Sequence, residues 1–405
     1  MMKNKKIAII GLGYVGLPLA MEFDKSREVV GFDIDTKRIE ELQNNNDTTF
    51  EVTSKELKNL KNTIFTNELS DIKECLIYII TVPTPVHIDK GPNLIPLKSA
   101  SEMIGKVLKP GDLVIYESTV YPGATEEVCI PILEKISRLK LNKDFTCGYS
   151  PERINPGDKD RHVTSIMKVT SGSSKAAAIE VDNLYKEIIN AGTHLAESIK
   201  IAEASKVIEN TQRDLNIALV NELSIIFNKL DIDTESVLKA AGTKWNFLSF
   251  NPGLVGGHCI GVDPYYLIHK SKEVGYTPEL ILSARKINEY MGEHITHKIV
   301  ELMRLKNILL EGANVLILGF SFKENCPDFR NTRIIDVYHN FEKLGCKIDI
   351  YDPYVSKVEV KKEFNIDLIN EPEKSKYDVI LMAVAHDEFR KISLQKLTSF
   401  AKEIH

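Results

Sequence analysis

The fold is decided by residues 7–16, which read Ile-Ala-Ile-Ile-Gly-Leu-Gly-Tyr-Val-Gly. The four apolar residues predict a buried strand, and the glycines predict a tight turn into a helix that begins near Leu17. Glycines let the backbone approach a pyrophosphate closely, and its charge then lies at the N-terminus of the helix. We therefore expect a dinucleotide-binding turn whose contacts come from Gly11, Gly13, Tyr14, Val15 and Gly16.

A second strand is predicted over residues 28–32 and ends at Asp33. A carboxylate at this distance from the glycines accepts hydrogen bonds from the ribose hydroxyls of NAD and repels the 2′-phosphate of NADP. Arg38 leaves NADP open, although its guanidinium could also stack on adenine or pair with Asp35. We expect NAD, with Asp33 and Arg38 as contacts.

Two further buried strands, at residues 76–81 and 113–118, lead into polar loops. Ligands bind at the carboxyl ends of strands in an open parallel sheet. Pro83, Thr84 and Thr119 are therefore candidates for cofactor contact. The two threonines could equally cap the helices that follow.

A strand over residues 145–150 precedes the loop 151–157, which carries Glu152 and Arg153 between two prolines. A carboxylate and a guanidinium on a rigid loop suit a small ligand. The alternative is an irregular surface turn.

The middle of the chain is helical, because apolar residues recur at helical spacing over residues 196–230 without proline or glycine. A helix of this length suits a bridge between domains or a dimer interface. Lys206 and Asn210 share a face and could stabilise a developing oxyanion, or Lys206 could be a solvated charge. A second helix is predicted over residues 279–305.

A candidate covalent site lies between these helices. Cys259 follows Gly256 and Gly257, which permit close approach of backbone and ligand, and Asp263 lies four residues on. Thiol and carboxylate could thus meet across one turn. The alternative is a small buried cysteine beside ordinary turn glycines.

Strand and helix patterns resume with strands near residues 312–319, 348–351 and 379–383. Lys323, Arg330 and Arg333 follow the first of these strands. Positive charge at this place suits a phosphorylated ligand, and an exposed basic loop is the alternative.

Composition narrows the function. The 405 residues exceed one ordinary core, and a net charge of −5 without a long basic run argues against nucleic acid or an anionic membrane as partner. No signal peptide or membrane-spanning segment is found, so we expect a cytoplasmic protein. The six cysteines lack the spacing of a zinc site or a disulfide framework.

The separated motifs together resemble the nucleotide-sugar 6-dehydrogenases of the UDP-glucose/UDP-N-acetylmannosamine dehydrogenase family. The motifs that carry the resemblance are the glycine turn, residues 82–85, 118–120 and 150–153, Lys206 with Asn210, residues 256–263, and Phe322-Lys323 with Arg330. Details at residues 153–159, 257–266 and 325–328 are similar to the branch acting on UDP-N-acetylglucosamine or UDP-N-acetylgalactosamine. UDP-glucose enzymes carry Cys-Phe-Pro-Lys-Asp at the cysteine, where this chain has Val262 in place of the lysine.

The resemblance implies an α/β protein with two Rossmann-like doubly wound domains joined by a long-helix central domain. Residues 1–195 would bind NAD, residues 196–300 would form the central helical dimerisation domain with the cysteine loop, and residues 301–405 would bind the UDP-sugar. A homodimer and catalysis in a cleft between two α/β lobes are also implied. A further strand is expected after the last helix, so this member is either short or truncated.

The resemblance also implies the oxidation of a primary alcohol to a carboxylate with two NAD⁺, through a thiohemiacetal and a thioester on Cys259. Lys206 and Asn210 would hold the oxygen that becomes anionic, Asp263 would orient water or relay a proton, and Glu152 would act as general base. Thr119 would position a water or the nicotinamide ribose, and Arg330 would contact NAD. The substrate would also meet Arg153, Phe250, Gly253, Gly256, Gly257 and Lys323.

Three other readings remain open. UDP-glucose 6-dehydrogenase shares the mechanism but not the acetamido group. A two-electron NAD-dependent dehydrogenase would not use Cys259. A non-catalytic nucleotide-sugar sensor would need no nucleophile at all.

Overall fold

The computed structural model describes residues 5–49, 51–87, 89–154 and 162–402. The chain divides into two compact units, Met1–Glu209 with Tyr265–Thr277, and Asn210–Pro264 with Pro278–His405. The expected limits near residues 195 and 300 stay a prediction. Each unit is described by itself below.

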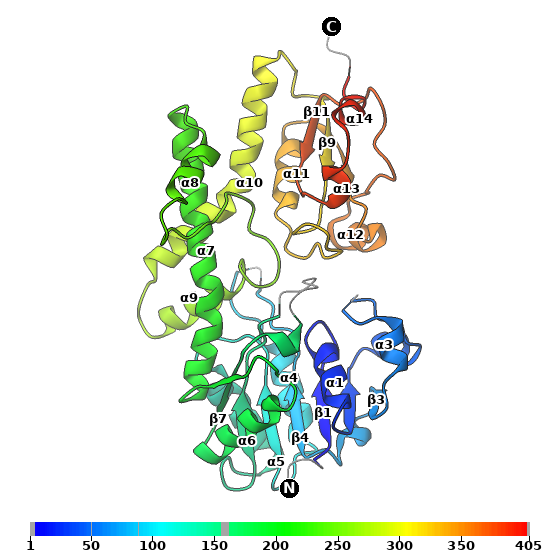
Figure 1. The fold of residues 1–405 in the computed structure, drawn as a ribbon, viewed down its shortest axis with the longest axis vertical. Coiled ribbons are helices and arrows are strands. Elements are labelled where there is room, and N and C mark those ends of the chain that lie inside the picture. The colour runs from blue at the N-terminus through cyan, green and yellow to red at the C-terminus, as the bar shows by residue number, and fades with distance from the viewer. Residues whose placement is uncertain (1–4, 50, 88, 155–161, 403–405) are drawn as a thin grey trace. The chain divides into compact units, whose positions relative to one another are not determined.

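The first unit is built on one eight-stranded sheet with the order β3-β2-β1-β4-β5-β6-β7-β8 (Figure 1). All neighbouring strands are parallel except β6 and β7. The order of the first six strands is that of a dinucleotide-binding doubly wound sheet, so the predicted fold class is confirmed. The strands are β1 (Ile7–Ile10), β2 (Val29–Phe32), β3 (Thr63–Thr66), β4 (Ile77–Ile80), β5 (Leu113–Tyr116), β6 (Thr146–Tyr149), β7 (Lys168–Gly172) and β8 (Thr193–Leu195).

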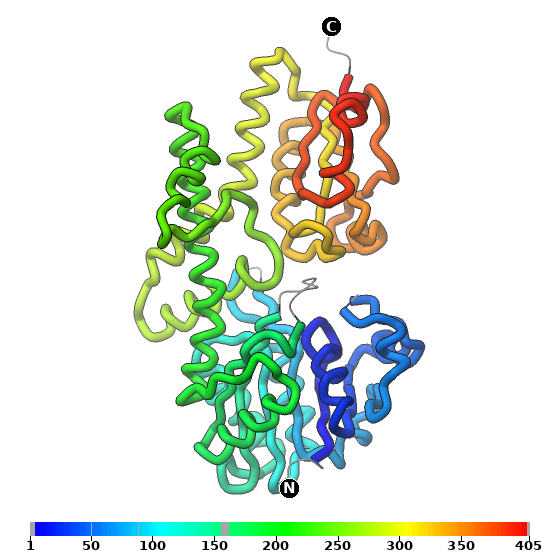
Figure 2. The backbone as a smooth tube through the Cα atoms, viewed as in Figure 1, coloured from blue at the N-terminus to red at the C-terminus, as the bar shows by residue number. Residues whose placement is uncertain are grey.

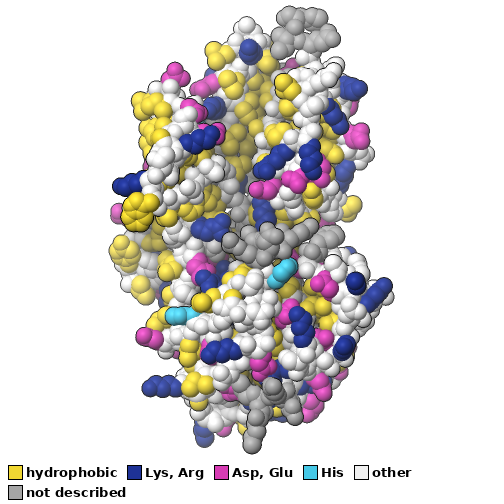
Figure 3. Space-filling model, in the orientation of Figure 1, with side chains coloured by type: hydrophobic (Ala, Val, Ile, Leu, Met, Phe, Trp, Pro, Cys, Tyr) yellow, Lys and Arg dark blue, Asp and Glu magenta, His cyan; other side chains and the backbone are white. Residues whose placement is uncertain are grey.

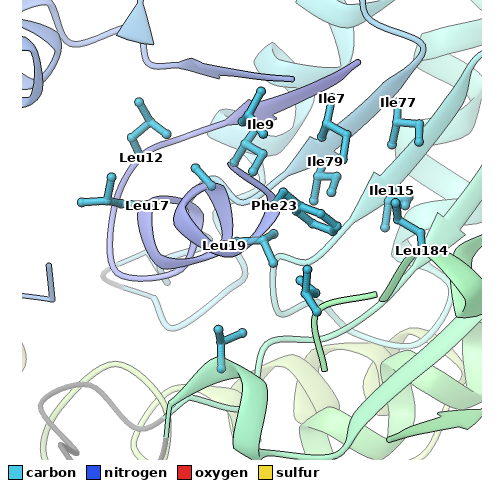
Figure 4. Close-up of a cluster of buried hydrophobic side chains, with 14 of the residues drawn as sticks. Ile7, Ile9, Leu12, Leu17, Leu19, Phe23, Ile77, Ile79, Ile115 and Leu184 are labelled. Atoms are coloured by element: carbon cyan, nitrogen blue, oxygen red, sulfur yellow. The ribbon is translucent and has the colours of Figure 1, made fainter. Parts of the chain in front are cut away.

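The helices of this unit cover the sheet and close its core. They are α1 (Gly16–Asp24), α2 (Thr36–Gln43), α3 (Ser54–Lys58), α4 (Ile95–Gly105), α5 (Ile130–Ser137) and α6 (Lys175–Lys186), with single turns at Leu69–Ile72, Thr125–Cys129 and Val163–Ser165. Figure 4 shows Phe23 of α1 and Leu184 of α6 pointing at Ile79 and Ile115 of the central strands. Strands buried on both faces are apolar throughout, which is why they could be predicted from the sequence.

Four helices, two of them long, form the helical part. They are α7 (Ile199–Lys229), α8 (Thr234–Ala241), α9 (Asp263–Glu273) and α10 (Glu279–Leu305). The second unit contains α7 from Asn210 onward, and the tube in Figure 2 shows the long non-helical connection that follows α8. Both predicted long helices are confirmed; α7 begins at Ile199 rather than near 196 because residues 193–195 form β8.

Buried polar groups join α7 to α10. Arg285 Nη1 lies 2.5 Å from Asp214 Oδ1, and Asn288 Nδ2 donates to the same oxygen at 2.7 Å. Asn221 Nδ2 donates to Asn288 Oδ1 at 2.8 Å, and the same side chain accepts from Gly253 N at 2.8 Å. Because buried polar groups need partners, this chain of contacts fixes the register of the two helices and holds the loop at Gly253.

A second, three-stranded parallel sheet has the order β10-β9-β11. Its strands are β9 (Asn314–Leu318), β10 (Lys347–Tyr351) and β11 (Val379–Met382), and its helices are α11 (Ile334–Lys343), α12 (Lys357–Phe364), α13 (Asp387–Arg390) and α14 (Leu394–Thr398). After α14 the chain turns back, and Ala401 pairs in parallel with Tyr377. Strand pairing therefore does begin after the last helix, where the resemblance led us to expect a strand; residues 403–405 lie outside the described part. No described helix combines the length and apolar character needed to span a membrane.

Candidate active site

The glycine turn after β1 has the geometry expected of a dinucleotide site. A Cβ at Gly16 would lie 1.8 Å from the carbonyl oxygen of Gly11, so only glycine fits there, whereas a Cβ at Gly13 would meet open space. Asp33 Oδ2 accepts a hydrogen bond from Leu12 N at 2.8 Å. The acidic residue at the end of β2 is therefore fixed against the turn, and the open side of Gly13 leaves room for a phosphate to approach the backbone.

The Arg38 side chain holds this turn in place through hydrogen bonds. Its guanidinium is buried and donates from Nε to the Leu12 carbonyl at 2.9 Å and from Nη2 to Asp47 Oδ1 at 2.8 Å. The guanidinium thus pairs with Asp47, whereas Asp35, one of the alternatives left open for it, accepts from Lys37 N and caps α2. Burial works to raise the pKa of Asp47, but hydrogen bonds from Thr49, the Val52 backbone and Arg38 hold it below its ordinary value.

The loops after β4 and β5 meet at the same edge of the sheet. Thr84 Oγ1 donates to the Thr119 carbonyl at 2.6 Å, and Ser118 Oγ donates to the Val82 carbonyl at 2.6 Å. The Tyr266 hydroxyl donates to the Thr84 carbonyl. The structure thus brings the two predicted threonines together, while Pro83 beside them is exposed. Thr84 uses its hydroxyl on the neighbouring loop rather than on a helix N-terminus.

Glu203 of α7 holds the loop that follows Thr119, and no sequence pattern had indicated a role for it. Its carboxylate accepts from Gly123 N at 2.5 Å and from Thr125 N at 2.9 Å. Burial raises the pKa of Glu203 to about 7. Lys206 lies three residues further along α7 and is only 7% exposed, which excludes the interpretation of a solvated charge.

Glu152 is tied at both oxygens. Oε1 accepts from Arg153 N at 2.6 Å and Ile154 N at 2.5 Å, and Oε2 lies 3.1 Å from Lys168 Nζ. Arg153 is half-buried and pairs with Glu209 at 2.7 Å. Residues 155–157, the rest of the predicted polar loop, lie outside the described part. Lys168 was missed, although a lysine inside an otherwise strand-like run was a visible signal.

Cys259 is partly exposed, whereas the other five cysteines are buried. Asp263 N donates to the Cys259 carbonyl at 2.8 Å, so thiol and carboxylate residues are separated by one hydrogen-bonded turn at the start of α9. Asn210 Nδ2 donates to Asp263 Oδ2 at 2.5 Å. Burial raises the pKa of Cys75 and Cys129 to about 12. Of these thiols, Cys259 has the setting expected of a nucleophile.

The glycines before the cysteine are needed for packing within the second unit. A Cβ at Gly256 would lie 2.9 Å from the Asn331 carbonyl oxygen, and one at Gly257 would lie 2.8 Å from the Phe322 ring. His258 Nε2 lies 2.9 Å from Asp328 Oδ2. Packing against the Asn331 backbone and the Phe322 ring therefore already requires glycine at both positions, apart from any contact with a ligand.

A cavity of about 290 Å³ opens at the carboxyl ends of β9 and β11. Gly253, Gly256 and Lys323, three of the expected substrate contacts, are among its lining residues; Phe250 and Gly257 are not. Its position follows the rule for open α/β sheets, and its size is at the lower limit of small-molecule sites.

Arg330, expected to contact NAD, forms two hydrogen bonds with Asp328, from Nε at 3.0 Å and from Nη2 at 2.8 Å. Burial works to raise the pKa of Asp328, but His258 and Arg330 hold it well below its ordinary value. The Arg330 side chain is still 45% exposed. It is therefore oriented and remains accessible.

A larger hollow of about 820 Å³ lies among α7, α8 and α10, where acidic side chains and Lys298 line it. No sequence pattern predicted this hollow. Among the described residues, no group of three or more His, Cys, Asp or Glu side chains is arranged to hold a metal.

Comparison with known proteins assigns the domains. Three models of the UDP-glucose/GDP-mannose dehydrogenase family match in order: the NAD binding domain at residues 5–189, the central domain at 200–290 and the UDP binding domain at 316–404. A UDP-N-acetyl-D-glucosamine 6-dehydrogenase from Salmonella typhi is 59% identical over 99% of this chain and 94% of its own. One of the same name from Pseudomonas aeruginosa is 57% identical over 100% of this chain and 96% of its own.

Among solved structures, a UDP-D-ManNAc dehydrogenase from Pyrococcus horikoshii superposes with a TM-score of 0.89 at 29% identity, covering 98% of this chain and 93% of its own. The glycine turn, the fixed Asp33 and the open side of Gly13 fit the NAD that the first family model implies. The chain is thus an NAD-dependent oxidoreductase that belongs to the UDP-glucose/GDP-mannose dehydrogenase family.

Proposed function

We propose that this protein oxidises the C6 alcohol of a UDP-N-acetylhexosamine, UDP-N-acetylglucosamine or its galacto epimer, to the carboxylate. The substrate assignment is supported by the two relatives of that name, which match along nearly the whole chain. The mechanism is supported by one observation above all: partly exposed Cys259 lies one turn from a buried carboxylate, Asp263, that is held by Asn210.

NAD⁺, when bound, accepts the two electrons of each oxidation as hydride, so one sugar consumes two NAD⁺ and one water and yields two NADH and three protons. Cys259 attacks the aldehyde formed in the first oxidation and holds it as a thiohemiacetal. The second oxidation converts this adduct to a thioester, and water releases the acid and the thiol. Covalent capture prevents loss of the aldehyde, which is the reason the reaction needs a nucleophile.

The other steps of the reaction are assigned to charged and polar side chains. Lys206 and Asn210 stabilise the oxygen that becomes anionic, since buried donors act strongly on developing charge. Asp263 takes and returns protons near Cys259, and Glu152 activates the hydrolytic water. Thr119 positions a water or the nicotinamide ribose.

Other residues bind the substrate and the cofactor. Lys323 and the cavity at the carboxyl ends of β9 and β11 receive the UDP-sugar, with the loop that includes Phe250 and Gly253 along the sugar. Asp33 binds the adenosine ribose. Arg330, accessible and held by Asp328, contacts NAD.

We also propose a homodimer formed through the central helices. Leu219 and Ile226 lie on one face of α7, Leu230 follows its last residue, and the three are 55%, 43% and 60% exposed. Trp245 in the connection after α8 is 92% exposed. Figure 3 shows hydrophobic side chains at the surface over α8. A patch of this kind marks an interaction surface, and its spacing along α7 suits helix packing.

The product, a nucleotide-linked uronic acid, would serve as a sugar donor for a surface polysaccharide, and we place the reaction in the cytoplasm with its nucleotide substrates. Cells that lack this protein are then expected to lose the N-acetylhexosaminuronic acid from their surface polysaccharide. An unchanged sugar composition would contradict this role.

The deciding experiment counts NADH formed per sugar consumed, with UDP-N-acetylglucosamine, UDP-N-acetylgalactosamine, UDP-N-acetylmannosamine and UDP-glucose offered separately. Two NADH with an N-acetylglucosamine or N-acetylgalactosamine substrate are expected. Two NADH with UDP-glucose alone would keep the mechanism and overturn the substrate, and one NADH per sugar would overturn the thioester route.

Serine substitutions at two separate cysteines test the covalent mechanism, one at the proposed nucleophile and one as a matched control. Cys259→Ser is expected to abolish net oxidation to the acid or stall at a bound intermediate. Cys346→Ser should leave turnover unchanged, because a hydroxyl can keep the hydrogen bond that Cys346 Sγ donates to the Leu310 carbonyl. Normal turnover in Cys259→Ser would contradict the covalent mechanism.

A further inference from the structure

A buried cluster of three charged side chains lies at the carboxyl ends of β5 and β6 and the start of β7. Lys168, the first residue of β7, places its Nζ 2.6 Å from Glu117 Oε2 and 3.1 Å from Glu152 Oε2. The side chains of Glu117 and Lys168 are 0% and 3% exposed. The Tyr185 hydroxyl of α6 donates to Glu117. Three elements of the sheet and one helix thus converge on a single ammonium group.

The electrostatics of the cluster are set by burial and pairing. Burial raises the pKa of Glu117 despite the neighbouring lysine. Burial works to lower the pKa of Lys168, but the charges of Glu117 and Glu152 outweigh it and raise that pKa. A buried charge persists when it is paired and hydrogen-bonded. Lys168 therefore stays cationic because it has two carboxylates.

Glu152 is the member of the cluster that reaches the surface, with its side chain 11% exposed. Its Oε1 is occupied by the backbone N–H groups of Arg153 and Ile154, so its Oε2 is the oxygen with room for a further partner beside Lys168. A carboxylate fixed by two N–H groups and an ammonium has one orientation. That orientation is a requirement for proton abstraction from a water.

We propose that Lys168 is a positioning residue for the hydrolytic step: its charge holds the Glu152 carboxylate in one orientation, and Glu117 is the counter-charge that keeps Lys168 in place. The inference rests on the proposed role of Glu152 as the base that activates water. Glu117 and Lys168 do not touch the substrate in this scheme and act through Glu152 alone.

The arrangement predicts opposite effects for the two partners of Lys168. Without the ammonium, the Glu152 carboxylate loses its cationic partner and faces Glu117 alone. Without the Glu117 charge, the ammonium is left with Glu152 as its carboxylate partner. A neighbouring like charge disfavours the ionised form of a carboxyl group and a neighbouring opposite charge favours it. The other facing groups are Tyr185, whose ring lies 5.2 Å from Lys168 Nζ, and Arg153 with Glu209. None of these is altered by the two substitutions.

The test measures hydrolysis of the enzyme thioester directly. The enzyme is mixed with UDP-N-acetylglucosamine and excess NAD⁺, quenched over time, and the acylated protein is followed by intact mass between pH 5 and 9. Lys168→Met should move the acidic limb of the hydrolysis profile upward by about one pH unit or more, and Glu117→Gln should move it downward. Lys168→Arg should restore the wild-type position, since it returns the charge.

Controls separate this effect from folding and from the parent proposal. Lys140→Met removes a lysine that is 66% exposed and pairs with Glu134 at 3.5 Å, and should change nothing. Should Lys168→Met fail to fold, ¹³C NMR titration of the Glu152 carboxyl in wild type and Glu117→Gln reads the same shift. If Glu152→Gln hydrolyses the thioester normally, the proposed role of Glu152 fails. If Glu152→Gln stalls while the other variants lose rate equally at every pH, a positioning role for Lys168 is overturned.

Discussion

Asn210 Nδ2 lies 2.5 Å from Asp263 Oδ2, and both side chains are more than nine-tenths buried. The pair joins α7 to the first turn of α9, which begins four residues after Cys259. An amide facing a carboxylate has a direction: the nitrogen donates and the oxygen accepts. The contact therefore specifies which element carries the negative charge.

Exchanging the two side chains tests this direction. Asn210→Asp alone places a second carboxylate against the first and should lower stability by about 3 kcal/mol, as an uncompensated buried charge does. Adding Asp263→Asn restores an amide-carboxylate contact and should recover the stability measured by urea denaturation. NADH turnover should stay lost in both, because both lack the Asn210 amide that α7 places against Asp263. A double variant no more stable than Asn210→Asp would contradict the pairing.

The raised pKa of Glu203 predicts how the stability of the protein depends on pH. Its pKa is raised by burial from 4.5 to about 7, so between these values the folded state binds the proton that the unfolded state has lost. The contribution of Glu203 to stability is therefore complete below pH 4.5 and is lost as pH rises to about 7, by at most about 3 kcal/mol. Glu203→Gln cannot titrate and should remove this slope.

The measurement compares the free energy of unfolding of wild type and Glu203→Gln at pH 5 and pH 8. The variant should gain relative to wild type at the higher pH. A matched control is Glu126→Gln, an exposed carboxylate close in sequence to the bonded Gly123 and Thr125, which should leave the slope intact. A constant difference between Glu203→Gln and wild type at both pH values would count against the burial effect.

Much of the fold could be predicted because buried parallel strands are apolar throughout and long helices repeat their apolar residues. β1 and α10 were predicted with the bounds that the structure shows. β3 was missed because it is short and partly exposed, with the sequence Thr-Ile-Phe-Thr, and β7 because a lysine and polar residues interrupt its pattern. That lysine is paired with Glu117 and Glu152, so its suitability for a buried strand depends on tertiary contacts.

In the candidate site, too, local patterns could be predicted and tertiary contacts could not. The sequence indicated Cys259 and Asp263 by their spacing, and Lys206 and Asn210 by their shared helix face. It could not show that Asn210 bonds Asp263, because a separation of 53 residues carries no periodicity. It left the partner of Arg38 open, with Asp35 as one alternative, and folding brings Asp47 to the guanidinium. Local geometry can thus be predicted from a sequence, whereas contacts between residues that are distant in the chain cannot.

Gly257 provides a prediction about the cysteine loop. It has φ +81°, and a Cβ there would lie 2.8 Å from the Phe322 ring. Gly257→Ala combines backbone strain of about 1 kcal/mol with a steric overlap of similar or larger cost, so we expect lower thermal stability and a large loss of NADH turnover. Gly275→Ala shares the positive φ of +84° but meets open space. It should show the strain alone and keep turnover; equal losses in both variants would mean that the ring contact is unimportant.

Trp245 decides whether the apolar surface on the central helices is a dimer interface. Its side chain is 92% exposed, so Trp245→Asp removes no internal packing and should leave thermal stability and secondary structure unchanged in a monomer. In a dimer it places a charge at a buried aromatic position, and large aromatic residues dominate interface energies, so the dissociation constant should rise about 30-fold or more. Sedimentation velocity over a range of protein concentrations measures this rise. Leu394→Asp, on α14 and 75% exposed, is the matched control: if it dissociates the protein while Trp245→Asp does not, the interface lies on the C-terminal lobe and the central-helix proposal is wrong.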